Sequence, residues 1–372
     1  MKNFPQSFSD KLSEREQNQS LRSLSGLSGL VDFSSNDYLG LAKSKEIFDK
    51  AHQFLSERKI FCNGATGSRL LSGNSELYEE TEKFLASFHN SEAALVFNSG
   101  FDANLGFFGA ITDRNSVILY DEYSHASIRD GIKLSYAKAY KFSHNNLDEL
   151  QQKLTLFCQE DRDVFVITES VFSMDGDSPD LKRLTDICCK HKAFLVVDEA
   201  HALGVFGQKG EGVVQSLNLQ DKVFARIITF GKALGAHGAV VVGSSKLKEY
   251  LLNFARSFIY TTALPPHSLA VILAAYNHLG KVDVQREQLR KNIILFNGLF
   301  RISDMSPIKS ILIEGNQNVK DTAQKLQKAG FDVKPILSPT VPQGKERLRF
   351  CLHSYNTEQE IKYLATVLKI SS

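Results

Sequence analysis

The sequence has no marked excess of charge, because 44 lysines and arginines stand against 42 aspartates and glutamates. A net charge of +2 gives no broad positive field for nucleic acid, so any anion must be bound by local groups. The five cysteines have no C-x-x-C spacing, which argues against a zinc site and against a disulfide framework. We therefore expect a protein of the reducing cytoplasm, with no nucleic-acid partner and no metal.

Long hydrophobic runs are also missing. No apolar stretch approaches the length of about 18 residues that a membrane span requires. The polar start, MKNFPQSFSDKLSEREQNQS, has no apolar core of the kind found in secretory signals. The glycine-rich stretch from Cys62 to Gly73 matches neither G-x-G-x-x-G nor the P-loop. A nicotinamide-dependent dehydrogenase on a Rossmann sheet is therefore only a remote alternative.

The order of the apolar segments predicts an α/β fold. Between residues 93 and 243, short β-branched runs alternate with helical patterns, which is typical of a parallel sheet covered by helices. The expected strands cover residues 94–97, 117–120, 164–168, 194–197, 226–229 and 239–243. Helices are expected over 147–157 and 181–191, the second with Ser178 as its cap and Pro179 at the first helical position.

Chain length and pattern predict two unequal domains. After Pro265 and Pro266 come two long helical stretches, then strand, helix, strand, strand and helix, as in a smaller α+β domain. The last helix opens with a capping box, Thr357 to Glu360. We expect an N-terminal segment over 1–44, a large domain over 45–255 and a small domain over 256–372.

Three chemically active residues are expected at the carboxyl ends of strands. Asp198 ends the run FLVVD, His201 follows three residues later, and Lys232 lies in TFGKALG after a later strand. Ligands of open α/β sheets collect at that edge, so these side chains can converge on one pocket. A lysine amine can form a Schiff base with pyridoxal 5'-phosphate (PLP), and an aspartate can keep its pyridine nitrogen protonated. Each residue alone has an ordinary structural interpretation, but the three together predict a PLP site.

Other strand ends supply further candidates. Gly100 and Phe101 would present N–H groups to a phosphate at the start of a helix, although the same turn also suits an ordinary strand-to-helix connection. Thr229 would add a hydroxyl at this edge. His125 follows a strand and can stack on a planar cofactor, with a surface histidine as the alternative. The turn-rich loop around Ser173 is a third strand-end segment.

In this order, the segments resemble the α-oxoamine synthases, a branch of the fold-type-I PLP enzymes. The resemblance rests on FSSNDYLGL, FSHNNLDEL, TESVFSMDGD, VVDEAHALGVFG, TFGKALG and SPTVPQGKERLRF, and it runs from Asn36 to Arg349. It implies a mostly parallel seven-stranded sheet and a homodimer with shared active sites. The most similar members condense L-alanine with a pimeloyl thioester in biotin biosynthesis, with loss of CO2. Coenzyme A and a carrier protein are both open as carriers of the acyl group.

The resemblance also implies residue roles. Lys232 would bind PLP as a Schiff base, Asp198 would pair with the pyridine nitrogen, and His125 would stack on the ring. The remaining cofactor contacts are expected from Gly100, Phe101, Ser173, His201, Thr229 and Thr261 or Thr262, of which the last pair would reach the phosphate of the partner subunit. Substrate contacts are expected from Arg22, Asn36 and Thr340.

Leu337 departs from the family pattern. The most similar members place an arginine three residues before the threonine that matches Thr340, where it can pair with a substrate carboxylate. Without a cation, a partly desolvated carboxylate would lose roughly 2–5 kcal/mol of binding, so another donor is expected. The candidates are Arg22, Arg69 and Arg347. We favour Arg69, with the alternative that it braces its own loop while Asn36 and water hold the carboxylate.

Two further alternatives remain open at this point. The same machinery serves glycine or serine with other acyl thioesters in 2-amino-3-ketobutyrate ligase, 5-aminolevulinate synthase and serine palmitoyltransferase. A non-catalytic subunit of the same fold would be expected to have lost its lysine, and Lys232 is present.

Overall fold

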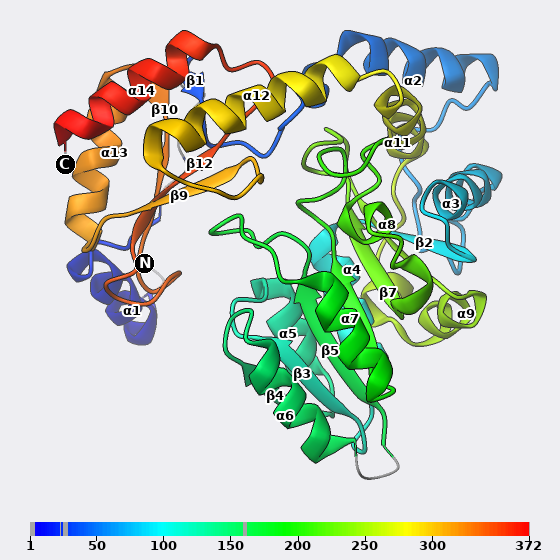
Figure 1. Cartoon of the computed structure of the whole chain (residues 1–372). Helices are drawn as coiled ribbons and strands as arrows, with labels where there is room; N and C mark the ends of the chain where they lie inside the picture. The colour runs from blue at the N-terminus through cyan, green and yellow to red at the C-terminus, as the bar shows by residue number, and fades with distance from the viewer. Residues whose placement is uncertain (1–3, 23, 25–28, 159–161, 372) are drawn as a thin grey trace. The chain divides into compact units, whose positions relative to one another are not determined.

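The computed structural model describes residues 4–22, 24, 29–158 and 162–371, and these form two compact units (Figure 1). The large unit comprises Asp37–Ser173 and Asp177–Arg286. The small unit comprises the described part of Met1–Asn36 together with Met174–Gly176 and Glu287–Ser372. A loop of the large unit thus contains three residues that group with the small one.

The large unit is built on a seven-stranded sheet. Its spatial order is β2-β8-β7-β6-β5-β3-β4, and only β8 runs antiparallel to its neighbours. The strands are β2 (Ala93–Phe97), β3 (Val117–Asp121), β4 (Lys138–Phe142), β5 (Val164–Glu169), β6 (Phe194–Asp198), β7 (Ala225–Thr229) and β8 (Ala239–Gly243). The six parallel strands therefore end at one common edge, and every βα connection that follows them begins there.

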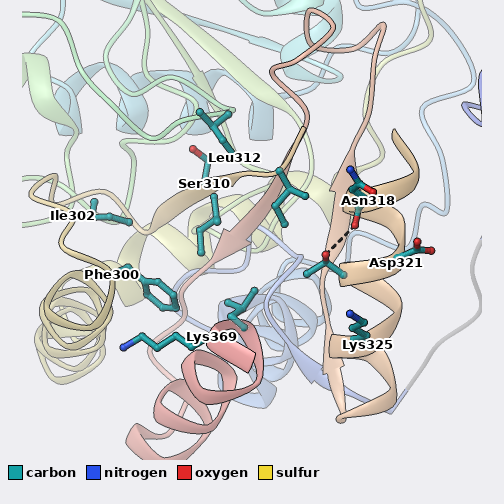
Figure 2. Close-up of a pocket in the computed structure, with 12 residues that line it drawn as sticks. Phe300, Ile302, Ser310, Leu312, Asn318, Asp321, Lys325 and Lys369 are labelled. Atoms are coloured by element: carbon teal, nitrogen blue, oxygen red, sulfur yellow. Dashed lines mark hydrogen bonds between the residues drawn. The ribbon is translucent and has the colours of Figure 1, made fainter. Parts of the chain in front are cut away.

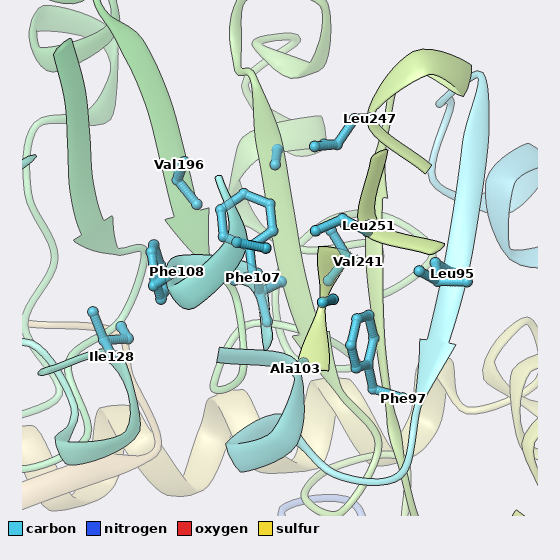
Figure 3. Packing of buried hydrophobic residues seen from close by; sticks show 14 of the residues in the cluster. Leu95, Phe97, Ala103, Phe107, Phe108, Ile128, Val196, Val241, Leu247 and Leu251 are labelled. Atoms are coloured by element: carbon cyan, nitrogen blue, oxygen red, sulfur yellow. The ribbon is translucent and has the colours of Figure 1, made fainter. Parts of the chain in front are cut away.

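Helices cover both faces of this sheet, because alternate strand residues point to opposite sides. On one face, Ile118, Phe165 and Ile167 belong to a core that α4 (Gly100–Ala110) and α5 (Ala126–Leu134) complete with Phe107, Phe108 and Ile128, and Figure 3 shows part of it. On the other face, Val117, Leu119 and Val164 pack with apolar residues of α6 (Leu147–Phe157) and α7 (Leu181–Lys190), among them Leu150 and Leu184. Both faces of the central strands are thus buried, as their apolar sequences predict.

The helices of the large unit can be given by their bounds. They are η1 (Leu41–Lys43), α2 (Lys45–Glu57), α3 (Glu76–Phe88), α4 (Gly100–Ala110), α5 (Ala126–Leu134), α6 (Leu147–Phe157), α7 (Leu181–Lys190), α8 (Val213–Ser216), η2 (Gln220–Lys222), α9 (Ser245–Phe254), α10 (Arg256–Ile259) and α11 (Pro266–Leu279). Helix α12 (Asp283–Phe300) starts in the large unit and continues in the small one.

The small unit combines two small sheets with helices. An antiparallel sheet has the order β11-β12-β9, and a short parallel pair joins β1 to β10. Its elements are α1 (Gln6–Gln17), β1 (Val31–Asp32), β9 (Ile308–Leu312), α13 (Asn316–Lys328), β10 (Phe331–Asp332), β11 (Lys334–Ile336), β12 (Arg347–Cys351) and α14 (Glu358–Ser371). Across the described ranges of both units, no helix combines the length and apolar character needed to cross a membrane.

The sequence predicted six of the seven strands of the large sheet but not β4. This strand reads KAYKF, lies at the edge of the sheet and is exposed along most of its length, so it lacks the buried apolar pattern. The range 181–191 predicted α7 (Leu181–Lys190) closely, but the predicted cap, Ser178 with Pro179 at the first helical position, was wrong. The helix begins at Leu181, and its cap is Asp180, whose carboxylate accepts the N–H of Arg183 at 3.0 Å. Asp180 caps as well as a serine does, and the chain before it is not helical.

The compact units divide the chain later than residue 255, the boundary that was expected between the large and the small domain. Residues 256–286 group with the large unit, and their hydrogen bonds give the reason. Asn98 donates to the carbonyl of Thr262 at 2.6 Å, and the Tyr78 hydroxyl accepts the N–H of Leu264 at 2.7 Å. Helix α11 then packs against α2 and α3. The capping box of α14 is present as predicted, with Glu360 and Thr357 bonded reciprocally at 2.7 and 3.2 Å.

Candidate functional site

Lys232 is tied to His201 at the carboxyl edge of the large sheet. Its Nζ lies 2.7 Å from Nε2 of His201, and Nδ1 of that ring lies 2.7 Å from the hydroxyl of Tyr38. His201 is buried, whereas Lys232 is half-buried. Because both ring nitrogens have partners, the orientation of the imidazole is fixed and the amine is directed by it. Tyr38 had no predicted role, although it lies in the quoted stretch SNDYLG.

Asp198 ends β6 and begins a second polar chain. Its Oδ2 accepts a hydrogen bond from Asn104 of α4 at 3.0 Å, and its Oδ1 accepts the N–H of Ala200 at 2.9 Å. The same Asn104 amide donates to the Ser127 hydroxyl at 2.9 Å. Asp198 is 6% exposed, so its charge is held by fixed donors in a poorly solvated place. Sequence reasoning missed Asn104, although a polar residue in the mostly apolar helix α4 was a signal that could have found it.

His125 continues this chain. The Ser127 hydroxyl lies 2.7 Å from His125 Nδ1, which also accepts the backbone N–H of Ser127 at 3.2 Å. Partial burial lowers the pKa of His125, and the charge of Lys232 lowers it further against the opposing effect of Asp198. An acceptor at Nδ1 and a lowered pKa both favour the neutral ring with its proton on Nε2. His125 therefore has an N–H that is available for a ligand group.

Glu169 lies beneath His125 and was also missed by the sequence reasoning. It ends β5, is paired in register with Asp198, and accepts the backbone N–H of His125 at 2.6 Å. Burial raises the pKa of Glu169 to about 8, and the charge of Asp198 acts in the same direction, whereas Lys232 opposes it. A glutamate at the end of a fully buried strand was the available signal.

The start of α4 forms an anion cradle at the same edge. The N–H groups of a first helical turn have no carbonyl of their own helix to bond, so they can face a phosphate. Ser99 caps the helix by accepting the N–H of Asp102 at 3.0 Å. A Cβ added at Gly100 would lie 3.1 Å from the Thr229 hydroxyl, so a side chain there would crowd the cradle. Phe101 follows with its ring half exposed.

Thr261 and Thr262 are held close to the end of β2. The Asn98 amide donates to the Thr261 hydroxyl at 3.2 Å and to the Thr262 carbonyl at 2.6 Å. The side chain of Thr262 is exposed. These contacts lie within one chain, and the role towards a partner subunit stays a prediction.

Ser173 is half-buried and is the last residue of the large unit before the three that group with the small unit. Its role towards the cofactor likewise stays a prediction. Among those three, Asp175 accepts a hydrogen bond from the Ser310 hydroxyl at 2.9 Å and is paired with Arg347. Arg347, a candidate replacement cation, is therefore engaged within the small unit.

Three of the predicted substrate residues, Asn36, Thr340 and Arg22, also lie in the small unit. Asn36 accepts a hydrogen bond from the guanidinium of Arg349 at 2.9 Å. Thr340 is exposed in a turn in which its N–H is bonded to Leu337 at 2.9 Å, and Arg22 is exposed as well. Arg349 lies in the stretch SPTVPQGKERLRF that resembles the family, but the sequence predicted no role for it. It places a cation directly beside Asn36.

Arg69 is enclosed by its own loop and by α3. Its guanidinium is paired with Glu82, donates to the Asn74 side chain at 3.0 Å and lies 3.9 Å from the centre of the Tyr78 ring. The Arg69 side chain is only 10% exposed, and that of Glu82 is 3% exposed. These contacts favour the interpretation in which Arg69 braces its loop over the interpretation in which it binds substrate.

A large hollow lies elsewhere, in the small unit (Figure 2). Its volume is about 770 Å³, and it is lined by Phe300 of α12, Ser310 and Leu312 of β9, and Asp321 and Lys325 of α13. None of the residues that the sequence predicted for the site lines it. The hollow is therefore distinct from the polar chain at the edge of the large sheet.

The residues at that edge fit PLP. A lysine amine is present for the aldehyde of PLP, and a poorly solvated carboxylate is present for its pyridine nitrogen. A neutral imidazole can stack on the planar ring, and the anion cradle can bind the phosphate. The charges of Asp198 and Lys232 both act on His125 and on Glu169, which shows that these groups share one electrostatic environment. Gly100 has no side chain, so the space between the helix start and the Thr229 hydroxyl stays open.

Known proteins resemble the chain over nearly its whole length. The family model for aminotransferase class I and II matches residues 28–368. An 8-amino-7-oxononanoate synthase of Emericella nidulans is 41% identical over 95% of this chain and 92% of its own length. The crystal structure of 8-amino-7-oxononanoate synthase from Francisella tularensis is 33% identical, with a TM-score of 0.78 over 92% of this chain and 97% of that one.

A second group of solved structures shares the fold at lower identity. A serine palmitoyltransferase with a PLP internal aldimine has a TM-score of 0.89 at 25% identity, over 100% of this chain and 98% of that one. Both groups are consistent with the PLP site built above. The chain therefore belongs to the aminotransferase class I and II family, in the branch that contains the 8-amino-7-oxononanoate synthases.

Proposed function

We propose that this chain condenses L-alanine with a pimeloyl thioester and forms 8-amino-7-oxononanoate, with release of CO2 and the free thiol. The observation that carries the proposal is the bond between Lys232 and His201 at the sheet edge that also holds Asp198. The choice of substrates is supported by the names of the relatives that are 41% and 33% identical.

Serine palmitoyltransferase activity is the second candidate, because such a structure superimposes with the higher TM-score, 0.89 against 0.78. A TM-score compares backbones, whereas substrate choice depends on side chains. Sequence identity is higher with the 8-amino-7-oxononanoate synthases, at 33% against 25%. The identities therefore favour L-alanine and a pimeloyl thioester over serine and a long-chain acyl thioester.

The residues at the sheet edge would have separate roles in the reaction. PLP, when bound, supplies an electron sink for the carbanion that forms at the Cα of the amino acid. Lys232 would bind its aldehyde and, once displaced by alanine, would take the proton from Cα with its Nζ. His201 holds that amine in place from one side. Asp198 would keep the pyridine nitrogen protonated through its charge.

His125 would act on the acyl donor. Its neutral ring carries the proton on Nε2, and such an N–H can donate to the thioester oxygen as negative charge develops there. Because the ring would also stack on PLP, donor and cofactor would be brought together. We also propose that two copies of the chain form a homodimer with shared active sites, in which Thr262 would reach the cofactor phosphate in the partner subunit. The acyl group would be carried by coenzyme A or by a carrier protein.

A substrate carboxylate would be bound by Arg349 and Asn36. The resemblance implies a substrate contact for Asn36, and the Arg349 guanidinium donates to the side-chain oxygen of Asn36 at 2.9 Å, which supports this proposal. A guanidinium offers several donors and binds carboxylates in a two-pronged manner. Arg349 can thus compensate for Leu337 more readily than Arg69, which is engaged by Glu82.

A paired substitution distinguishes the two arginines. We expect Arg349→Met to raise the KM for alanine at least about tenfold, because losing a charged hydrogen bond costs on the order of 1.5–3 kcal/mol. Arg69→Met should leave alanine binding unchanged but lower the free energy of unfolding by about 2 kcal/mol, since the buried Glu82 would lose its pair with Arg69 and keep its pair with Lys248. Steady-state kinetics and urea unfolding measure the two effects. The reverse pattern would restore Arg69 as the substrate residue.

A substrate panel tests the proposed function itself. The purified holoenzyme is offered alanine, glycine and serine, each with pimeloyl, acetyl, succinyl and palmitoyl thioesters, and thiol release is followed. We expect the highest kcat/KM with alanine and the pimeloyl thioester. A clear preference for serine with a palmitoyl thioester would move the chain to the second candidate function, and release of no thiol with any pair would refute both.

A further inference from the structure

His144 lies between two carboxylates at the same sheet edge and has no part in the function proposed so far. It follows β4 in the stretch FSHNN. Its Nδ1 is 2.8 Å from Oδ1 of Asp121, at the end of β3, and its Nε2 is 2.7 Å from Oδ2 of Asp177. The ring is stacked on Tyr123 with centroids 4.4 Å apart, and Phe172 meets it edge-on at the same distance.

The two carboxylates belong to loops that carry predicted cofactor residues. Asp121 starts the turn that leads to His125, and it also accepts the N–H groups of Tyr123 and Asn145, each at 2.8 Å. Asp177 ends the loop that contains Ser173, and its carbonyl accepts the N–H of Phe172 at 2.9 Å, which closes that loop. The ring of His144 therefore bridges the two loops, and Asn145 reinforces this bridge, because its side-chain amide donates to the same Oδ2 of Asp177 at 2.7 Å.

The bridge requires a charged ring. A carboxylate oxygen only accepts hydrogen bonds, so both ring nitrogens must donate, which makes the ring an imidazolium. Burial alone would lower the pKa of His144, but the hydrogen bonds and charges of Asp121 and Asp177 raise it to about 10. Glu122 also accepts the backbone N–H of His144 at 3.1 Å, and Lys141 lies 3.8 Å from Glu122. The ring thus stays charged at neutral pH.

We propose that His144 is a positioning residue of the cofactor site, whose positive ring ties the loop that carries His125 to the loop that carries Ser173. The inference rests on the proposed function, because those two residues matter only if PLP binds at this edge. Asp121 is fully buried, so the contact cannot be replaced by water without exposing or neutralising that carboxylate. The neutral ring could donate to only one of its two partners, so the link between the loops would be weakened and would depend on Asn145.

The first test measures PLP binding to apoenzyme rather than turnover. His144→Gln keeps a donor and an acceptor but removes the charge, and we expect the Kd for PLP to rise at least tenfold. The matched control is His278→Gln, which removes another histidine that faces a carboxylate, Glu46 at 3.5 Å, between α11 and α2. We expect the control to lose stability without a change in the PLP Kd. An unchanged Kd in His144→Gln would overturn the inference.

A second variant tests whether His144 acts through its bridge to Asp177. Asp177→Asn should weaken PLP binding as much as His144→Gln does. The double variant should bind PLP no more weakly than either single variant, because each of the three proteins loses the same bridge. If His144→Gln fails to fold, Asp177→Asn tests the bridge in its place. Additive losses would contradict the bridge.

The sign of the pH effect follows from the raised pKa. The charged ring should stabilise the fold fully below its unfolded pKa of 6.5, and this contribution should vanish as the pH rises through about 10. The difference in Tm between the wild type and His144→Gln should shrink in the same way, and a constant difference would overturn the role of the charge. Wild-type protein that binds no PLP would refute the proposed function, whereas PLP binding that is equal in wild type and His144→Gln would refute only this inference.

Discussion

Lys232→Ala should abolish synthase activity while leaving PLP bound without a covalent link. The substitution removes the amine that would hold the aldehyde and the base that would move the Cα proton, and a positioned general base alone contributes about 100- to 10,000-fold. The cradle of Gly100 and Thr229 and the charge of Asp198 are unaltered, so they should retain the cofactor. We expect kcat to fall by at least about a thousandfold.

Borohydride reduction provides the direct measurement. In the wild type, reduction should fix the cofactor irreversibly to the peptide that contains Lys232, and in Lys232→Ala no peptide should be labelled. Lys246→Ala, which changes an exposed lysine of α9, is the control and should be labelled and active like the wild type. A label on any other lysine of the wild type would show that the cofactor lysine is misassigned.

The sequence indicated the strands of the large sheet because their apolar runs are buried on both faces. It also indicated that Asp198 and Lys232 would share an edge, since a residue that follows a parallel strand has its position determined by topology. Strand β4 was not predicted, because an exposed edge strand that contains lysines lacks a buried apolar run. The register of the strand ends then explains why Glu169 lies beside Asp198.

Contacts between side chains that are far apart in the sequence were harder to predict. Nothing in the sequence shows that Asn104 of α4 bonds Asp198, because the two are 94 positions apart and an asparagine on a helix has many possible partners. The same holds for Arg69, whose place in a glycine-rich loop suggested a substrate contact. The structure shows Glu82 beside it, and a helix residue 13 positions away leaves no local signal for such a pair.

Asp198→Asn should slow removal of the alanine Cα proton by about two to four orders of magnitude. The amide has no charge with which to keep the pyridine nitrogen protonated, so the ring would withdraw electrons less strongly. Breaking a buried charge pair costs on the order of 3–5 kcal/mol, and each 1.36 kcal/mol corresponds to a factor of ten in rate. Exchange of the alanine Cα proton in D2O, followed by NMR without any acyl thioester, isolates this step.

A graded series makes the prediction specific to the charge. Asn104→Ala removes one donor to Asp198 but leaves its charge, and losing a hydrogen bond to a charged group costs about 1.5–3 kcal/mol, so exchange should slow by roughly ten- to a hundredfold. Asp186→Asn, at an exposed carboxylate of α7 that lies 3.6 Å from Lys222, should have no effect. Exchange rates are compared at equal PLP content, so that loss of cofactor is not mistaken for loss of charge. If Asp198→Asn exchanges the proton as fast as Asn104→Ala, the carboxylate acts only through its hydrogen bonds, and its proposed pairing with the pyridine nitrogen is wrong.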